Sequence, residues 1–197
     1  MRIGIFGGAF NPVHNGHISL ARRSISELAL DKLILVPTAD PPHKSGADFP
    51  SAKARLDMLS LAFKDFDNTV VSDVEFKRQG KSYSYYTVNQ IAALYPGAKL
   101  FLIIGQDQFM NFDSWYRYRD ILNNVTLFAA ARNENSKNQM IEAAKNAGIA
   151  DYVLSDTPPV VVSSSEIRNC LACGGDASSL LPGNVLKYIK EKGLYLD

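Results

Sequence analysis

The stretch MRIGIFGGAFNPVHNGH, residues 1–17, decides the fold of this chain. Its apolar residues 3–6 predict a buried strand, and the amphipathic residues 16–30 predict a helix. Gly7 and Gly8 form the predicted turn between them, where glycine can adopt positive φ and let the backbone approach a ligand closely. The amides of a first helical turn lack intrahelical partners and the helix dipole favours anions there, so this order of elements predicts a phosphate site.

Two of the three histidines, His14 and His17, lie at the start of that helix. Side chains three residues apart share a helical face, so both imidazoles can point toward a ligand above the N-terminus. Imidazole titrates near neutral pH and can donate hydrogen bonds to phosphoryl oxygens. Zinc is the less favoured alternative, because helical zinc pairs usually take i,i+4 spacing. A purely structural role for either histidine stays open.

Alternating strands and helices continue along the whole chain. Buried strands are predicted at residues 32–36, 99–104 and 125–130, with a shorter one at 160–162, and helices at residues 52–63, 85–94 and 137–147, the last stopped by Gly148. This alternation predicts an α/β fold with a doubly wound, Rossmann-like parallel sheet. Ligands of such sheets bind at the carboxyl ends of the strands.

Composition and charge limit the classes of protein. The 197 residues, 46% of them hydrophobic, can bury one core, so we expect one domain over residues 1–197. A net charge of +1 with dispersed charges does not suggest a nucleic-acid partner. The sequence lacks a long apolar segment and a signal-peptide pattern, so we expect neither membrane insertion nor secretion but a cytoplasmic location. The oligomeric state stays open, a homo-oligomer included.

Two further motifs lie close together near the C-terminal end. Ser163 and Glu166 form a capping box that predicts a helix start. Ser164 and Ser165 add hydroxyls there, and Arg168 can fold back as a cation suited to phosphate. The CxxC pair that follows, at 170 and 173, is interpreted as ordinary helix packing, because the sequence offers no second ligand pair for zinc nearby.

The segment GGAFNPVHNGH resembles the HxGH nucleotidyltransferases, and among them most closely the bacterial nicotinate mononucleotide adenylyltransferases. Four further segments match that family in order: PTADPPHK at residues 37–44, SYSYYT at 82–87, GQDQFMNFDSWYRYRDI at 105–121 and VSSSEIR at 162–168. The resemblance spans nearly the whole chain. No single segment is unique to one enzyme, but the ordered set is specific.

The resemblance implies adenylyl transfer from ATP to nicotinate mononucleotide, which gives nicotinate adenine dinucleotide and pyrophosphate in NAD biosynthesis. A phosphate monoester has its second pKa near ~6 and is already an anionic nucleophile at neutral pH, so direct in-line attack needs no general base. His14, His17, Arg168 and a Mg²⁺ ion that comes with ATP would stabilise the developing charge, with no dedicated protein metal site. The implied ATP-binding residues are Gly7, Gly8, Ala9, Phe10, His17, Gly105, Asp107, Ser163, Ser164, Ser165 and Arg168.

The acceptor side is also carried over from the resemblance. Trp115 would stack on the nicotinate ring, although anchoring a hydrophobic core is an equally good interpretation of this residue. The backbone amides around Ser84 and Tyr85, and that of Tyr116, would meet the ring carboxylate. His43 and Lys44, in a polar segment over residues 38–51, and Arg132 complete the implied acceptor site.

One departure and several alternatives remain. The family more often shows GGTFDP where this chain has GGAFNP, so Ala9 lacks a hydroxyl and Asn11 lacks a charge. A phosphopantetheine adenylyltransferase or a cytidylyltransferase is the nearest alternative activity. A nucleotide-binding protein without catalysis is the alternative from another class, while near-neutral charge speaks against a fragment of an aminoacyl-tRNA synthetase.

Overall fold

A six-stranded parallel sheet forms the centre of the protein in its computed structural model, which describes residues 1–40, 50–131, 133–155 and 160–196. Its strands are β1 (Arg2–Gly8), β2 (Lys32–Pro37), β3 (Thr69–Val71), β4 (Lys99–Ile103), β5 (Val125–Ala130) and β6 (Tyr152–Ser155). Their spatial order is β3-β2-β1-β4-β5-β6, so the order reverses between β1 and β4. The predicted doubly wound α/β fold is therefore confirmed.

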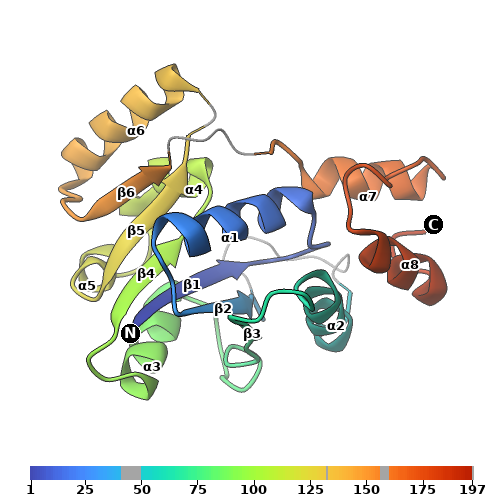
Figure 1. Ribbon diagram of the computed structural model, residues 1–197, viewed down its shortest axis with the longest axis horizontal. Coiled ribbons are helices and arrows are strands. Elements are labelled where there is room, and N and C mark those ends of the chain that lie inside the picture. Colours follow the sequence, from blue (N-terminus) through green and yellow to red (C-terminus); the bar gives the residue numbers. More distant parts are fainter. Residues whose placement is uncertain (41–49, 132, 156–159, 197) are drawn as a thin grey trace.

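Helices cover both faces of the sheet because successive strand residues point to opposite faces. Phe6 belongs to one buried cluster and Ile5 to the other. The first cluster is completed by α1 (Asn15–Glu27), α2 (Ala52–Ala62), α7 (Ser164–Ala172) and α8 (Gly183–Lys192). The second cluster is completed by α3 (Ser84–Leu94), α4 (Gln106–Met110), the 3₁₀ turn η1 (Phe112–Ser114), α5 (Tyr118–Leu122) and α6 (Glu134–Ala147). Figure 1 shows α1 crossing the sheet, with α7 and α8 together at one end of the molecule.

Local signals place several element ends correctly. Gly148 ends α6 with φ of 69°, a left-handed conformation that favours glycine. The Ser163 hydroxyl accepts a hydrogen bond from the Glu166 amide and caps α7, as the capping motif predicts. The first helix ends at Glu27 rather than at residue 30, because the chain turns at Ala29 with φ of 45°.

The strand predicted at residues 160–162 is wrong. These residues belong to no strand among the described residues, and Val161 is 71% exposed. The last strand is β6 instead, which pairs with β5 at the edge of the sheet. An edge strand of four residues, three of them only partly buried, carries too weak a hydrophobic pattern to stand out in the sequence. Within the described ranges, the structure contains no helix that is long and apolar enough to cross a membrane.

Gly4 tests how tightly the buried cluster packs against β1. A Cβ placed there would lie 2.6 Å from Leu30 and 2.8 Å from both Leu33 and Ile103, which are side chains of one packed cluster. We expect Gly4→Ala to lower the free energy of unfolding by about 1–2 kcal/mol through overpacking. Gly183→Ala is the matched control, because a Cβ at the start of α8 meets no described atom within 4 Å and should leave stability equal or higher. Denaturant unfolding of both variants measures this, and equal midpoints would contradict it.

Candidate functional site

A cavity of about 790 Å³ opens where the strand order reverses. The ends of four neighbouring strands contribute to its wall through Gly7 and Gly8 at the end of β1, Thr38 after β2, Gly105 after β4 and Ala130 on β5. Its size lies in the range of sites for nucleotide-sized ligands. The cavity thus lies at the carboxyl ends of the strands, where the sequence analysis expects ligands to bind.

The loop between β1 and α1 turns at Phe10 rather than at the glycines. Gly7 and Gly8 lie within β1 and neither has positive φ, whereas Phe10 has φ of 45°. The expected glycine turn is therefore wrong. A Cβ on Gly8 would lie 3.3 Å from the Phe10 ring, so a larger residue there would push on the ring. The Phe10 ring is buried and packs at 4.9 Å from the His17 ring, so Phe10 supports the site from below without lining the cavity.

The two histidines are stacked together at the N-terminus of α1, as the spacing predicts. Their ring centroids lie 3.7 Å apart, and both rings line the cavity. Nδ1 of His17 accepts a hydrogen bond of 3.2 Å from the backbone amide of His14. A nitrogen that accepts carries no proton, so neutral His17 holds its hydrogen on Nε2 as a donor. Nδ1 of His14 is buried and has no hydrogen-bond partner among the described residues.

Gly16, between the two histidines, has little room around it for a side chain. A Cβ at this position would lie 3.0 Å from the Val160 carbonyl oxygen and 3.1 Å from the His14 ring. Residues 160–162 also line the cavity. The chain before α7 thus passes close to the start of α1, and a side chain at Gly16 would push on the Val160 carbonyl and the His14 ring. The glycine of the HxGH motif therefore serves packing.

Burial changes the charge of both imidazoles. His14 is 6% exposed, and burial lowers its pKa from 6.5 to about 4. Burial also lowers the pKa of His17 well below 6.5, and a charge on His14 lowers it further. Both groups are therefore expected to titrate below the neutral range usual for imidazole. At pH 7 the site presents two neutral imidazoles, which act as hydrogen-bond donors and acceptors rather than as cations.

The opposite end of the cavity is aromatic. Trp115 is half-buried, packs on Phe112 at a centroid distance of 4.9 Å, and also lines the cavity. Its packing on Phe112 fits the core interpretation, and its stacking on a ligand ring stays a prediction. Ser84, the first residue of α3, and Tyr116 line the cavity as well, and the Tyr116 ring stacks on Tyr83 at 4.6 Å. Two segments that are remote in sequence therefore meet at this end.

Tyr85 lies behind this aromatic wall and does not line the cavity. The guanidinium carbon of Arg117 lies 4.2 Å from the centre of the Tyr85 ring. The predicted contribution of residue 85 was a backbone amide, and it does lie in the first turn of α3.

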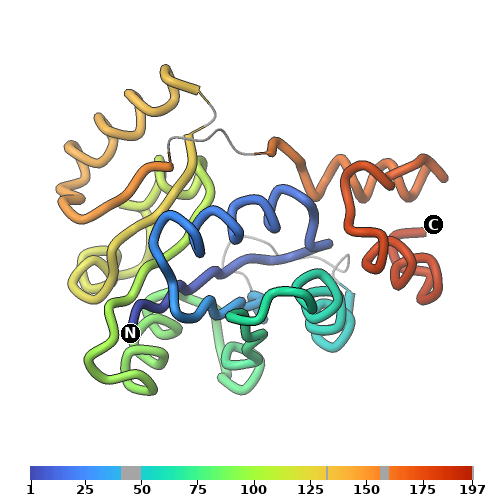
Figure 2. Tube along the Cα trace, viewed as in Figure 1, coloured from blue at the N-terminus to red at the C-terminus, as the bar shows by residue number. Residues whose placement is uncertain are grey.

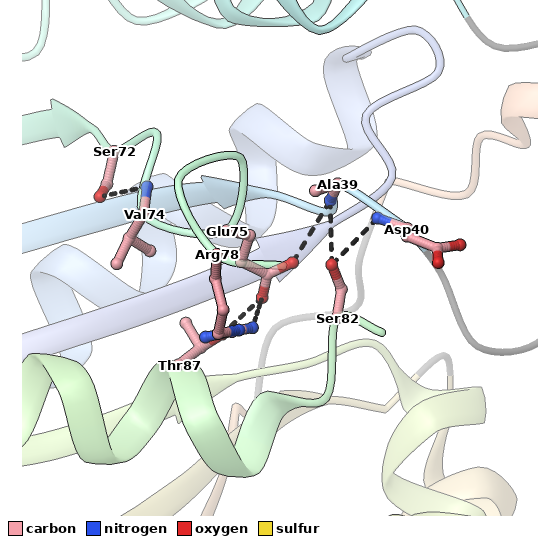
Figure 3. Close-up of polar contacts among 8 residues, drawn as sticks. All are labelled: Ala39, Asp40, Ser72, Val74, Glu75, Arg78, Ser82 and Thr87. Atoms are coloured by element: carbon pink, nitrogen blue, oxygen red, sulfur yellow. Dashed lines mark hydrogen bonds and ion pairs between the residues drawn. The ribbon is translucent and has the colours of Figure 1, made fainter. Parts of the chain in front are cut away.

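A buried polar network, which sequence reasoning missed, joins α3 to the end of β2 (Figure 3). Glu75 is buried and accepts hydrogen bonds from the Thr87 hydroxyl and, at 3.4 Å, from the Ala39 amide. The Ser82 hydroxyl accepts from the amides of Ala39 and Asp40 at 3.2 and 3.0 Å. Both Glu75 and Ser82 line the cavity. An acidic residue between Val74 and Phe76 was the only sequence signal for this network.

The remaining predicted residues fall into separate groups. Gly105 and Asp107 line the cavity at the N-terminus of α4, and Ala9 lines it beside the histidines. The α7 group, Ser163, Ser164, Ser165 and Arg168, is not part of the cavity wall. Arg168 donates 2.8 Å to the Asn11 carbonyl oxygen and 3.1 Å to the Ser165 hydroxyl. His43, Lys44 and Arg132 lie outside the described residues.

The described part of the cavity wall carries acidic but no basic side chains apart from the histidines. Among described residues, its only ionisable groups besides the histidines and tyrosines are the acids Glu75 and Asp107, without lysine or arginine. An anionic ligand is therefore met here by backbone amides, imidazoles and the dipoles of α1 and α3.

Comparisons with known proteins agree with this geometry. Residues 5–170 match the cytidylyltransferase-like family. A protein of Borreliella afzelii named probable nicotinate-nucleotide adenylyltransferase is 41% identical over 196 residues, which cover 100% of this chain and 97% of that protein. A protein of Geotalea daltonii with the same name is 36% identical, with coverage of 100% and 99%. The solved nicotinic acid mononucleotide adenylyltransferase of Plasmodium falciparum, in complex with NaAD, has the same fold, with a TM-score of 0.79, 19% identity and coverage of 98% and 97%.

The lowered pKa of His14 predicts a pH dependence of stability. As pH falls below 6.5, the unfolded chain takes up a proton that folded His14 takes up only near pH 4, so the free energy of unfolding falls over this window. Between pH 7 and pH 5 this one group should remove about 2 kcal/mol. We expect His14→Gln to lose that much less stability over the same interval. Denaturant unfolding at both pH values measures the difference, and parallel losses in the two proteins would exclude a buried neutral His14.

Proposed function

The chain belongs to the cytidylyltransferase-like family, and we propose that it is a nicotinate-nucleotide adenylyltransferase, which joins ATP and nicotinate mononucleotide and releases pyrophosphate. One observation carries the proposal: a single cavity connects the histidine pair of α1 with the aromatic end at Trp115 and α3. A reaction between two nucleotides needs such a continuous space, with a phosphate site at one end and a ring site at the other.

The chemistry requires positioning and charge stabilisation. The acceptor phosphate is already an anion at neutral pH, with its second pKa near ~6, and attacks the α-phosphorus of ATP while the bond to pyrophosphate breaks. His17 is suited to donate from Nε2 to a phosphoryl oxygen, because its Nδ1 is held by the His14 amide. A neutral donor fixed in this way stabilises developing charge without having to reorganise. Arg168, bound to the loop at Asn11, would add positive charge close by.

Mg²⁺ fits this cavity as an ion that arrives with the triphosphate. The described residues hold no cluster of three His, Cys, Asp or Glu side chains, and Mg²⁺ commonly binds through substrate phosphates, waters and one or two carboxylates. Asp107 is a carboxylate in the cavity wall that could contribute. The ion would neutralise phosphate charge, which the described wall does not do with lysine or arginine.

The ring end of the cavity favours an acidic acceptor. The first-turn amides of α3 at Ser84 and Tyr85 lie at the positive end of a helix of eleven residues. Amide donors bind a carboxylate more strongly than a carboxamide, so nicotinate is favoured over nicotinamide. Trp115, fixed from behind by Phe112, offers a flat surface for the ring. The cytoplasmic location expected from the sequence is part of the same proposal, because the reaction consumes ATP.

Pyrophosphate release tests the activity and the acceptor together. With ATP and Mg²⁺, we expect strong turnover on nicotinate mononucleotide, weak turnover on nicotinamide mononucleotide and none on phosphopantetheine. His17→Ala should lower kcat by about 10²–10³-fold, the usual loss for one preorganised donor to developing charge. Turnover on phosphopantetheine alone would reject the acceptor, and no turnover on any of the three would favour a binding protein.

The role of Trp115 is tested by separating the two substrates. Stacking on a base contributes about 1–3 kcal/mol, so Trp115→Ala should raise KM for nicotinate mononucleotide about tenfold or more. KM for ATP should change by less than about threefold, and Trp115→Phe should recover most of the loss because it keeps an aromatic face. Steady-state kinetics with each substrate varied in turn measures this. Equal rises in both KM values would instead assign Trp115 to the core.

A further inference from the structure

Side chains outside the cavity donate hydrogen bonds to the carbonyl oxygens of the loop between β1 and α1. Arg55 of α2 is 3% exposed and donates from one nitrogen to the carbonyl oxygens of Ala9, at 3.2 Å, and Thr38. Arg168 donates to the Asn11 carbonyl oxygen, and the Ser164 hydroxyl donates to that of Pro12 at 3.3 Å. None of these three donors lines the cavity. They hold the loop from behind, on the side of α2 and α7.

The C-terminal segment adds a further contact to this loop. The Tyr195 hydroxyl donates a hydrogen bond of 2.6 Å to the side-chain oxygen of Asn11, across 184 residues of sequence. Asn11 is only 5% exposed, so its amide oxygen depends on protein donors. Burial raises the pKa of Tyr195, against the smaller opposing effect of the Arg168 and Arg55 charges, and the hydroxyl therefore stays a donor at neutral pH.

The backbone at Tyr195 is shaped for this contact. α8 ends at Gly193 with φ of 60°, and Tyr195 itself has φ of 61°. A bulky residue rarely adopts this conformation unless its surroundings hold it there. Figure 2 shows the chain turning back after α8, so that its C-terminal end lies on the side of α7 and α8. The turn brings a residue from the end of the chain to the loop that begins the site.

We propose that Tyr195 is a positioning residue for the triphosphate end of the cavity, acting through Asn11 on the loop that carries Ala9 and His14. This inference rests on the proposed function. Without the hydroxyl, the loop would spend less time in the conformation that binds ATP, and apparent affinity falls in proportion to that fraction. The acceptor end, built from α3 and the segment around Trp115, shares no described hydrogen bond with Tyr195. The effect should therefore be specific to ATP.

Tyr195→Phe removes only the hydroxyl. We expect KM for ATP to rise about five- to twentyfold, while KM for nicotinate mononucleotide changes by less than about twofold. Tyr188→Phe is the matched control, because the Tyr188 hydroxyl, on α8, donates 2.9 Å to Asp57 on α2 and not to the loop. That control should leave both KM values unchanged. A Tyr195→Phe protein that behaves like Tyr188→Phe, or that raises both KM values together, would overturn the proposal.

Substitutions at Asn11 test whether the effect passes through this one bond. Asn11→Asp keeps an acceptor and should keep KM for ATP within about twofold, whereas Asn11→Ala should weaken ATP binding as Tyr195→Phe does. The double variant Asn11→Ala/Tyr195→Phe should be no weaker than Asn11→Ala alone, and additive losses would overturn the proposal. If Tyr195→Phe is unfolded at the assay temperature, the two Asn11 variants carry the test.

Calorimetric titration with ATP alone tests the role of Tyr195 separately from the proposed activity. Wild-type protein that binds ATP but does not turn over nicotinate mononucleotide would contradict the proposed function. The ratio of ATP affinities among the wild type, Tyr195→Phe and Tyr188→Phe would still decide whether Tyr195 positions the loop. Equal affinities in all three proteins would overturn the positioning role even if the enzyme activity is established.

Discussion

The reversal of strand order between β1 and β4 is the constraint on which the rest of the structure depends. β2 and β3 extend the sheet on one side of β1, and β4, β5 and β6 extend it on the other. Connections that leave neighbouring parallel strands in opposite directions cannot close over their carboxyl ends, so a crevice remains there. The loop after β1 and the residues after β4 form its two walls. Gly7, His17 and Asp107 are among the proposed binding residues that line the cavity in this crevice.

Burial sets the protonation state of the histidine pair. Two imidazoles with centroids 3.7 Å apart would repel each other if both were charged, and Phe10 closes off one side of His17 from solvent. The pair is therefore neutral, and the hydrogen bond from the His14 amide leaves the His17 proton on Nε2. The site thus begins with fixed dipoles rather than with cations. This suits a site that must accept a highly charged nucleotide and then release a charged product.

The loops of the site are held by hydrogen bonds from elements that are distant in sequence. The loop after β1 receives donors from α2, from α7 and from Tyr195, which follows α8. A second network, in which Glu75 and Ser82 join α3 to the end of β2, adjoins Thr38, whose carbonyl oxygen accepts from Arg55. Among the described hydrogen bonds, Tyr195 joins the first of these networks and not the second.

The sequence by itself determined the alternation of helices and strands, the cap at Ser163, the stop at Gly148 and the position of the histidine pair at the start of α1. These features depend on local periodicity and on contacts within one turn, and both are set by residues a few positions apart. Only the tertiary structure decided the turn at Phe10, the edge strand β6, the neutral state of His14 and His17, and the contacts of Glu75 and Tyr195. Their cause is burial and contact between remote segments, such as Asn11 and Tyr195, and a pattern of nearby residues does not record which distant group will lie against them.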